Sequence, residues 1–191
     1  MENILKSSVK ESIAVKQAIL EDEALQLRIG AAASCLVSVF KAGGKALFCG
    51  NGGSAADAQH IAAELSGRFY IDRPPLFAEA LHVNSSYVTA VGNDYGYDLI
   101  FARMTEAAGR KGDALVAFST SGNSPNIIKA VEKARSLGMI VIGLTGASGG
   151  KMRDICDFLL NVPSSDTPRI QESHILIGHI ICQVVEVEMF G

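Results

Sequence analysis

The stretch that decides the fold is residues 46–54, Ala-Leu-Phe-Cys-Gly-Asn-Gly-Gly-Ser. Its four leading apolar residues predict a short buried strand. The three glycines that follow allow the backbone to turn sharply and to approach a ligand with its N–H groups. Residues 55–65 then have the pattern of a helix, which Gly67 ends. The stretch therefore predicts one strand–loop–helix unit of an α/β protein.

Strand and helix patterns alternate along the rest of the chain. We expect further strands at 76–81, 114–118, 139–144 and 158–162 and helices at 102–108, 125–137 and 168–188, while 87–91 fits a strand or a short helix. Repeated strand–helix units predict a three-layer α/β/α sandwich with a mostly parallel sheet. We see no linker or composition shift, so residues 1–191 are predicted to form a single domain.

Residues 1–42 predict a helical segment in front of that core. Apolar residues recur at helical spacing up to Leu20 and again from Leu25 to Phe40, on either side of an acidic break at 21–23. Two amphipathic helices favour packing on another subunit. Packing onto the chain's own sheet is the alternative.

Composition narrows the class of protein. Hydrophobic residues make up 48% and charged residues 19%, with a formal net charge of −3, so no broad basic surface for nucleic acid is expected. Four scattered cysteines indicate a reduced compartment. The start lacks the apolar run of a signal peptide, and no stretch approaches the ~18 consecutive apolar residues of a membrane span. We therefore expect a cytoplasmic protein that does not bind a membrane.

Two loops follow predicted strands and have the composition of phosphate sites. One is 50–54; the other is 119–124, Ser-Thr-Ser-Gly-Asn-Ser, with Ser124 at a helix N-cap and Pro125 at the first helical position. Hydroxyls, free N–H groups and a helix N-terminus suit a phosphate dianion. Either loop alone is common as a turn or a cap. Together they favour a ligand site, whereas the third glycine-rich loop, 145–150, can be a simple turn.

The first loop also mimics a dinucleotide fingerprint, Gly50-x-Gly52-x-x-Ala55. Asp72 lies near the distance expected for a ribose-binding acid, but it precedes a predicted strand instead of ending one. A dinucleotide would also leave the Ser/Thr loop unexplained. No nucleotide cofactor is therefore predicted.

Two predicted helices carry groups that can move protons. His60 and Glu64 are four residues apart and share a helix face. Gln171 and His179 are eight apart on the last helix, about 80° around it, so both can border one pocket. A helical histidine is more often a core or interface residue than a ligand, but His179 lies in an otherwise apolar run. A carboxylate and an imidazole fit the two proton transfers of aldose–ketose isomerisation.

These motifs together resemble the sugar isomerase (SIS) domain and, within it, the bacterial phosphoheptose isomerases. The resemblance covers nearly the whole chain and is carried by residues 40–45, 49–54, 57–60, 63–68, 91–96, 119–124 and 169–175. It implies a flavodoxin-like sheet, a homotetramer with sites at subunit contacts, and conversion of D-sedoheptulose 7-phosphate to D-glycero-D-manno-heptose 7-phosphate, which leads to the ADP-heptose of the lipopolysaccharide core.

The resemblance also implies a role for each matching residue. Glu64 resembles the general base and His179 its acid–base partner. Asn51, Gly52, Gly53, Asn93 and Asp94 match positions that hold the sugar, and Gln171 matches a contact to substrate and metal. Ser119, Thr120, Ser121 and Ser124 match the phosphate cradle. A zinc site is implied at His60, Glu64, Gln171 and His179, although zinc on Glu64 would compete with its role as base.

Three other functions fit parts of the pattern. A non-catalytic SIS paralogue that binds the bacterial replication initiator shares the architecture and tetramer but lacks the paired Glu and His. A phosphosugar-sensing regulator needs a DNA-binding module, for which we expect no room in 191 residues. An isomerase of phosphohexoses or phosphopentoses stays open, because the length of a pocket is a three-dimensional property.

Overall fold

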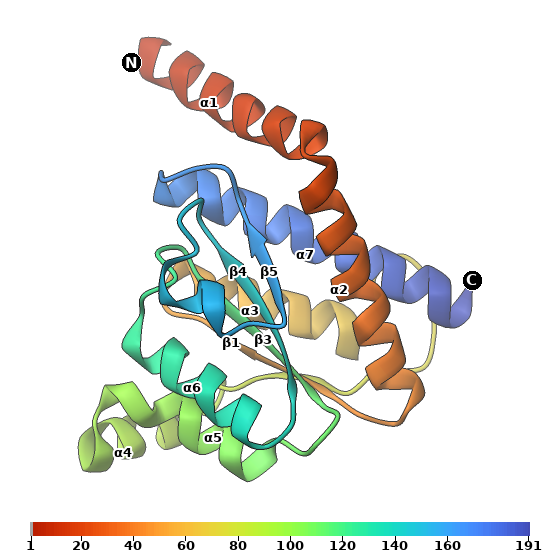
Figure 1. Ribbon diagram of the computed structural model, residues 1–191, viewed down its shortest axis with the longest axis vertical. Helices are drawn as coiled ribbons and strands as arrows, with labels where there is room; N and C mark the ends of the chain where they lie inside the picture. The colour runs from red at the N-terminus through yellow and green to blue at the C-terminus, as the bar shows by residue number, and fades with distance from the viewer. Residues whose placement is uncertain (1) are drawn as a thin grey trace.

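The computed structural model describes residues 2–191 and shows a five-stranded sheet between two layers of helices (Figure 1). All neighbouring strands are parallel, in the order β2-β1-β3-β4-β5. This is the flavodoxin-like order, with its topological switch point between β1 and β3. The predicted fold class is confirmed. The strands are β1 (Ala46–Cys49), β2 (Ala78–Ala80), β3 (Ala114–Ser119), β4 (Ile140–Thr145) and β5 (Phe158–Asn161).

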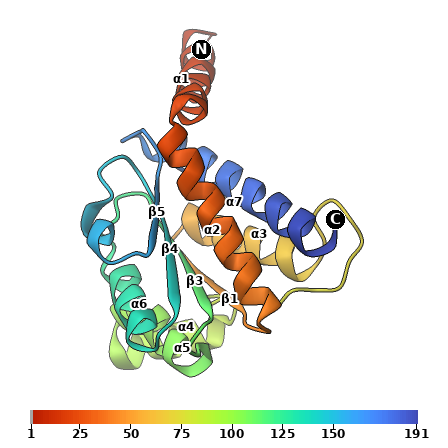
Figure 2. The ribbon, with the colours of Figure 1, turned by 45° about the vertical axis from the view of Figure 1, so that its right-hand side comes forward.

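Helices α2, α3 and α7 cover one face of the sheet, and α4, α5 and α6 cover the other (Figure 2). Successive side chains of a strand point to opposite faces, so Phe48 and Val116 lie in the first core, and Leu47 and Leu115 in the second. The elements are α1 (Glu2–Glu21), α2 (Glu23–Lys41), α3 (Gly53–Ser66), α4 (Ser85–Tyr95), the 3-10 turn η1 (Tyr97–Leu99), α5 (Ile100–Ala108), α6 (Pro125–Ser136), η2 (Gly150–Asp154) and α7 (Thr167–Phe190).

The segment that the sequence left open between strand and helix, 87–91, belongs to helix α4. Asn84 caps this helix, because its side-chain oxygen accepts from the backbone N–H of Tyr87 at 3.0 Å. The predicted strand 76–81 is shorter in the structure, since β2 lies at the edge of the sheet and pairs only with β1. The other expected elements begin and end within a few residues of their predicted bounds.

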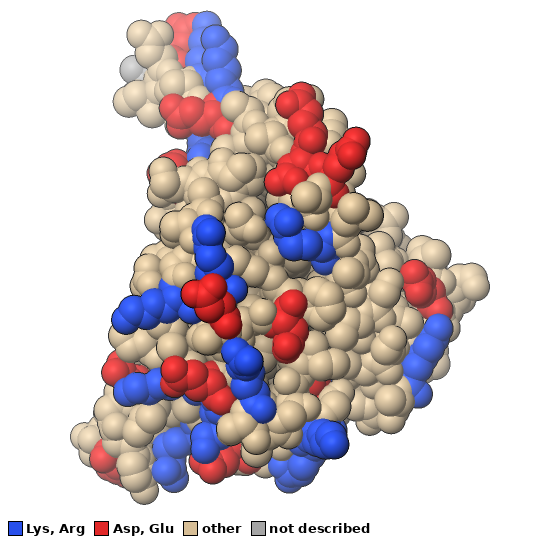
Figure 3. Space-filling view, viewed as in Figure 1, with Lys and Arg blue, Asp and Glu red and all other residues tan. Residues whose placement is uncertain are grey.

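Helices α2 and α7 are apolar because they pack against the sheet and against each other. By length and composition alone, either helix could cross a membrane, with a mean hydropathy of 1.3 in each. In the fold, however, 44% of each apolar window is buried. On the face seen in Figure 3, basic and acidic side chains are interspersed.

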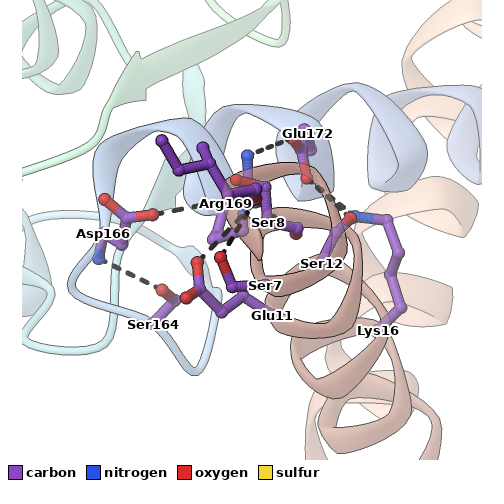
Figure 4. A network of polar contacts seen from close by, with 10 residues as sticks. Ser7, Ser8, Glu11, Ser12, Lys16, Ser164, Asp166, Arg169 and Glu172 are labelled. Carbon is purple, nitrogen blue, oxygen red and sulfur yellow. Dashed lines mark hydrogen bonds and ion pairs between the residues drawn. The ribbon is translucent and has the colours of Figure 1, made fainter. Parts of the chain in front are cut away.

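Helix α1 extends away from the body of the molecule (Figure 1). Ile19 is its one buried residue among those described. A polar network joins α1 to the start of α7 (Figure 4): Ser12 Oγ donates to Glu172 Oε2 at 2.7 Å, and Arg169 contacts both Glu172 and the backbone oxygen of Ser8. The hydrogen bond from Ser12 lowers the pKa of Glu172, although burial opposes this. The network fixes the direction in which α1 leaves the core.

Candidate active site

The first loop links β1 to α3 at the switch point of the sheet. Gly52, with φ +56°, precedes the first turn of α3, and the backbone N–H of Ser54 donates to Asn51 O at 3.0 Å. The side-chain amide of Gln171 from α7 lies where a Cβ on Gly53 would stand, within 2.9 Å of that position. The structure therefore brings Asn51, Gly52, Gly53 and Gln171 together at one edge of the sheet.

Asn51 is held by two residues from other elements. Its amide exchanges hydrogen bonds with the amide of buried Asn126, each at 2.9 Å, and Tyr97 Oη donates to Asn51 Oδ1 at 3.3 Å. Asn126 lies in the first turn of α6, directly beyond the Ser/Thr loop. The amide pair thus connects the two predicted ligand loops.

The second loop, Ser119–Ser124, joins β3 to the N-terminus of α6. Ser124 occupies the N-cap as predicted, but its side chain does not cap the helix; its hydroxyl lies 3.1 Å from that of Ser119. Ser121 Oγ accepts from the backbone N–H of Asn123 at 3.1 Å. Thr120 is half-buried between Ser119 and exposed Ser121. Four hydroxyl side chains and a helix N-terminus thus belong to one turn, which suits an anion.

The third glycine-rich loop packs against the second. A Cβ on Gly122, whose φ is +65°, would meet the backbone oxygen of Gly149 at 2.1 Å. The backbone N–H of Gly146 also donates to Thr120 O at 2.9 Å. Residues 145–150 therefore support the shape of the second loop from outside.

His60, Glu64 and His179 form one cluster between α3 and α7. His60 Nε2 lies 2.9 Å from Glu64 Oε1 and 3.2 Å from His179 Nε2. Their candidate ligand atoms all lie within 4.8 Å of one another. The helices approach closely here because Gly178 leaves room for the side chain of Ile61. The spatial pairing of Glu64 with an imidazole of the last helix is thus present within one chain.

The cluster borders an open hollow of about 440 Å³, which Ala56, Gln59 and Ala63 also line. Half of the His60 side chain and a quarter of the Glu64 side chain are exposed. His60 and Glu64 are therefore accessible to a ligand.

The donor set suits a metal ion. Two nitrogens bound to one tetrahedral zinc at about 2.0–2.1 Å lie about 3.3 Å apart, close to the 3.2 Å between the two imidazoles. Two histidines and a glutamate are also a ligand set of catalytic zinc enzymes, which keep one position open. His60, Glu64 and His179 together fit such an ion.

The remaining predicted residues lie apart from this cluster. Gln171 precedes His179 by eight residues, about 12 Å along α7, and its amide packs against Gly53. Within one chain, three of the four predicted metal ligands are therefore gathered. Asn93 and Asp94 are exposed on the last turn of α4, where Asn93 Nδ2 donates to Asp94 Oδ1 at 2.8 Å.

Sequence reasoning missed three residues that shape the site. Asn126 and Tyr97 bind Asn51, and the ring of Phe69 stacks on His179, with 5.5 Å between ring centroids. Asn126 follows Pro125 in the first turn of a helix that begins at a ligand loop, and this position was a usable signal. Nothing in the sequence pattern marks Tyr97 or Phe69.

The fold and the two loops match a known domain. Residues 9–146 match the family model described as the SIS domain. The match covers more than half of the chain, so this is a SIS-domain protein, in agreement with its parallel sheet.

Similarity over the whole chain narrows the family. The chain is 54% identical to the phosphoheptose isomerase of Aneurinibacillus thermoaerophilus over 190 residues, covering 100% of this chain and 96% of that protein. Phosphoheptose isomerase 2 of Campylobacter jejuni is also 54% identical, with the same coverage. The chain belongs to the phosphoheptose isomerase family.

Solved structures agree with this family. The phosphoheptose isomerase of Neisseria gonorrhoeae superposes with a TM-score of 0.92 at 44% identity, covering 97% of this chain and 98% of that one. The phosphoheptose isomerase of Francisella tularensis gives a TM-score of 0.93 at 42% identity, with 97% of each chain covered. The comparisons give no support to the replication-initiator alternative.

Proposed function

We propose that this protein, an isomerase by its family, converts D-sedoheptulose 7-phosphate to D-glycero-D-manno-heptose 7-phosphate. The observation that carries the proposal is the cluster of His60, Glu64 and His179 in a chain 54% identical to phosphoheptose isomerases. Aldose–ketose isomerisation needs one proton moved between adjacent carbons and another moved between two oxygens. A carboxylate and an imidazole side by side provide both transfers.

Glu64 acts as the general base on carbon. Its carboxylate removes the C1 proton of the open-chain ketose, and the C2 carbonyl becomes part of an enediol. His179 moves the hydroxyl proton from O1 to O2. The proton on Glu64 then returns to C2, which leaves the C1 aldehyde. Atoms and electrons balance without a redox cofactor.

The two loops hold the substrate while the cluster reacts. Ser119, Thr120, Ser121 and Ser124 bind the 7-phosphate with their hydroxyls and the N-terminus of α6. Asn51, Gly52 and Gly53, together with Gln171, Asn93 and Asp94, bind the hydroxyls of the sugar chain. Support comes from the contact of Gln171 with Gly53 and from the amide pair that joins the two loops.

We also propose one zinc ion per subunit. His60, Glu64 and His179 would hold it, whereas Gln171, the predicted fourth ligand, lies apart from them within one chain. Zinc supplies a Lewis acid that polarises the oxygens of a bound carbonyl or hydroxyl. The support is the donor set and the spacing of the two imidazoles.

The active protein is proposed to be a cytoplasmic homotetramer that opens the route to ADP-heptose for the lipopolysaccharide core. Exposed apolar side chains on α1 support assembly with further copies, because a stripe of this kind is normally buried. The members of this stripe are Ile4, Leu5, Val9 and Ile13, each more than half exposed. The scattered, free cysteines support a reduced compartment.

A coupled assay of sedoheptulose 7-phosphate turnover tests this function. We expect turnover by the protein as purified, loss after a chelator, and recovery on adding zinc, with about one zinc per subunit measured by elemental analysis. Fructose 6-phosphate and ribulose 5-phosphate serve as shorter substrates and should react far more slowly. Faster turnover of either one would replace the heptose assignment by a hexose or pentose assignment.

A further inference from the structure

Arg73 and Glu186 form an ion pair inside the protein, between the segment after α3 and the last turns of α7. Arg73 Nε lies 3.2 Å from Glu186 Oε1, and the side chains are only 2% and 3% exposed. The same carboxylate accepts the backbone N–H groups of Phe69, Tyr70 and Ile71 at 2.8–3.3 Å. Burial raises the pKa of Glu186, but these N–H groups and Arg73 outweigh it, so its pKa is lowered.

The guanidinium of Arg73 also closes the end of helix α3. Its Nη2 donates to Glu64 O at 2.8 Å, and its Nη1 donates to Leu65 O at 2.7 Å and Gly67 O at 3.1 Å. The last carbonyls of a helix have no partner inside it and carry partial negative charge. Arg73 therefore fixes the turn of α3 that carries the proposed base, through a bond to the backbone of Glu64 itself.

The segment held by Glu186 places an aromatic ring on the other catalytic group. Phe69 stacks on the imidazole of His179, with an angle of 28° between the ring planes. Glu186 lies seven residues after His179, which is about two turns along the same face of α7. One ion pair thus connects the backbone of Glu64, the ring of Phe69 and the helix of His179.

The ion pair and its hydrogen bonds fix positions more than they add stability. A buried ion pair is often no more stabilising than apolar side chains of the same volume, because both charges lose their hydration. A carboxylate with four donors and a guanidinium that also donates to four backbone carbonyls, however, permit little displacement of the segments that they join. The network is therefore better explained by the segments that it holds in place than by a gain in the free energy of unfolding.

We propose that Arg73 and Glu186 are positioning residues for the isomerase reaction, which hold the last turn of α3 and the ring of Phe69 in register with His179. This rests on the proposed function of Glu64 and His179. Both side chains are almost fully buried, so their effect should fall on kcat and leave KM nearly unchanged.

Glu186→Gln tests the proposal, with Asp113→Asn as a matched control. Asp113 is 5% exposed, pairs with Lys45 Nζ at 2.6 Å and accepts two backbone N–H groups, but its partners, Lys45 and Arg110, lie outside α3 and α7. Both variants are measured for kcat and KM with sedoheptulose 7-phosphate, and for hydrogen–deuterium exchange of the amides of residues 69–71.

We expect Glu186→Gln to lower kcat by about tenfold to a hundredfold, since small misplacements of reacting groups have effects of this size. KM should stay within threefold, and amides 69–71 should exchange faster. Asp113→Asn should leave kcat within twofold and these amides protected. Unchanged kcat in a folded Glu186→Gln protein, unchanged amide exchange, or an equal loss of kcat in both variants would each overturn the proposal.

Phe69→Leu keeps the proposal testable if Glu186→Gln does not fold. It removes the ring over His179 and leaves the ion pair intact, so kcat should fall several-fold while amides 69–71 stay protected; unchanged kcat would contradict the proposed positioning. A wild-type protein without turnover would instead refute the proposed function. The exchange data would still decide whether the pair holds the segment.

Discussion

At the residue scale, His174 is the most buried histidine of the chain. It is fully buried in α7 against Phe118. Burial lowers its pKa to about 4, although the backbone of Thr145 opposes this. Because five residues separate it from His179, about 140° around the helix, it faces away from that residue.

This burial gives a pH dependence with a defined sign. The folded pKa lies below the ordinary value of 6.5, so the unfolded chain binds the proton first as the pH falls. The contribution of neutral His174 to the unfolding free energy is complete above pH 6.5 and is lost as the pH falls toward 4. Acidification from pH 7.0 to 4.5 should therefore lower the unfolding free energy of His174→Gln by about 2–3 kcal/mol less than that of the wild type. Urea titrations at both pH values measure it; equal losses in the variant and the wild type would contradict it.

At the element scale, the loop after β3 depends on a residue without a side chain. Gly122 has a positive φ, and a Cβ there would lie 2.1 Å from Gly149 O. Gly122→Ala should reduce the unfolding free energy by about 2 kcal/mol or more and raise KM for the phosphorylated substrate, because the hydroxyls of the loop are displaced.

Ser148→Ala is the control for this prediction, since residue 148 is exposed in the adjoining loop and the change adds no atoms. Urea denaturation and steady-state kinetics measure both variants. If Gly122→Ala matched Ser148→Ala in stability and KM, the packing of the two loops would not shape the phosphate site.

The helices, strands and loops differ in how far the sequence alone could predict them. The first two loops were placed together correctly because carboxyl ends of neighbouring parallel strands meet at one edge of a sheet. Periodicity could not decide residues 87–91, where Asn84 and its capping bond determine the helix. It also could not find the pairing of Asn51 with Asn126 or the stacking of Phe69 on His179, since these contacts join residues 75 and 110 positions apart.

At the scale of the whole molecule, α1 leaves the core with an apolar stripe exposed (Figure 1). Val9 and Ile13 are 52% and 60% exposed. If α1 forms the proposed interface between copies, replacing both by aspartate should lower the oligomeric state, because charged groups would be buried there. Light scattering after gel filtration measures the mass. Lys10→Asp, on the same helix and exposed, is the control and should leave the mass unchanged; an unchanged mass for the double variant would contradict the proposed role of α1.

The proposed isomerase mechanism depends on Glu64 acting as the base beside His179. The most direct measurement is kcat of Glu64→Gln with sedoheptulose 7-phosphate, compared with the wild type and with Glu79→Gln, an exposed glutamate on β2. We predict that Glu64→Gln loses about 10²–10⁴-fold in kcat, whereas Glu79→Gln stays within twofold of the wild type. A folded Glu64→Gln protein that kept wild-type turnover would contradict the proposed mechanism.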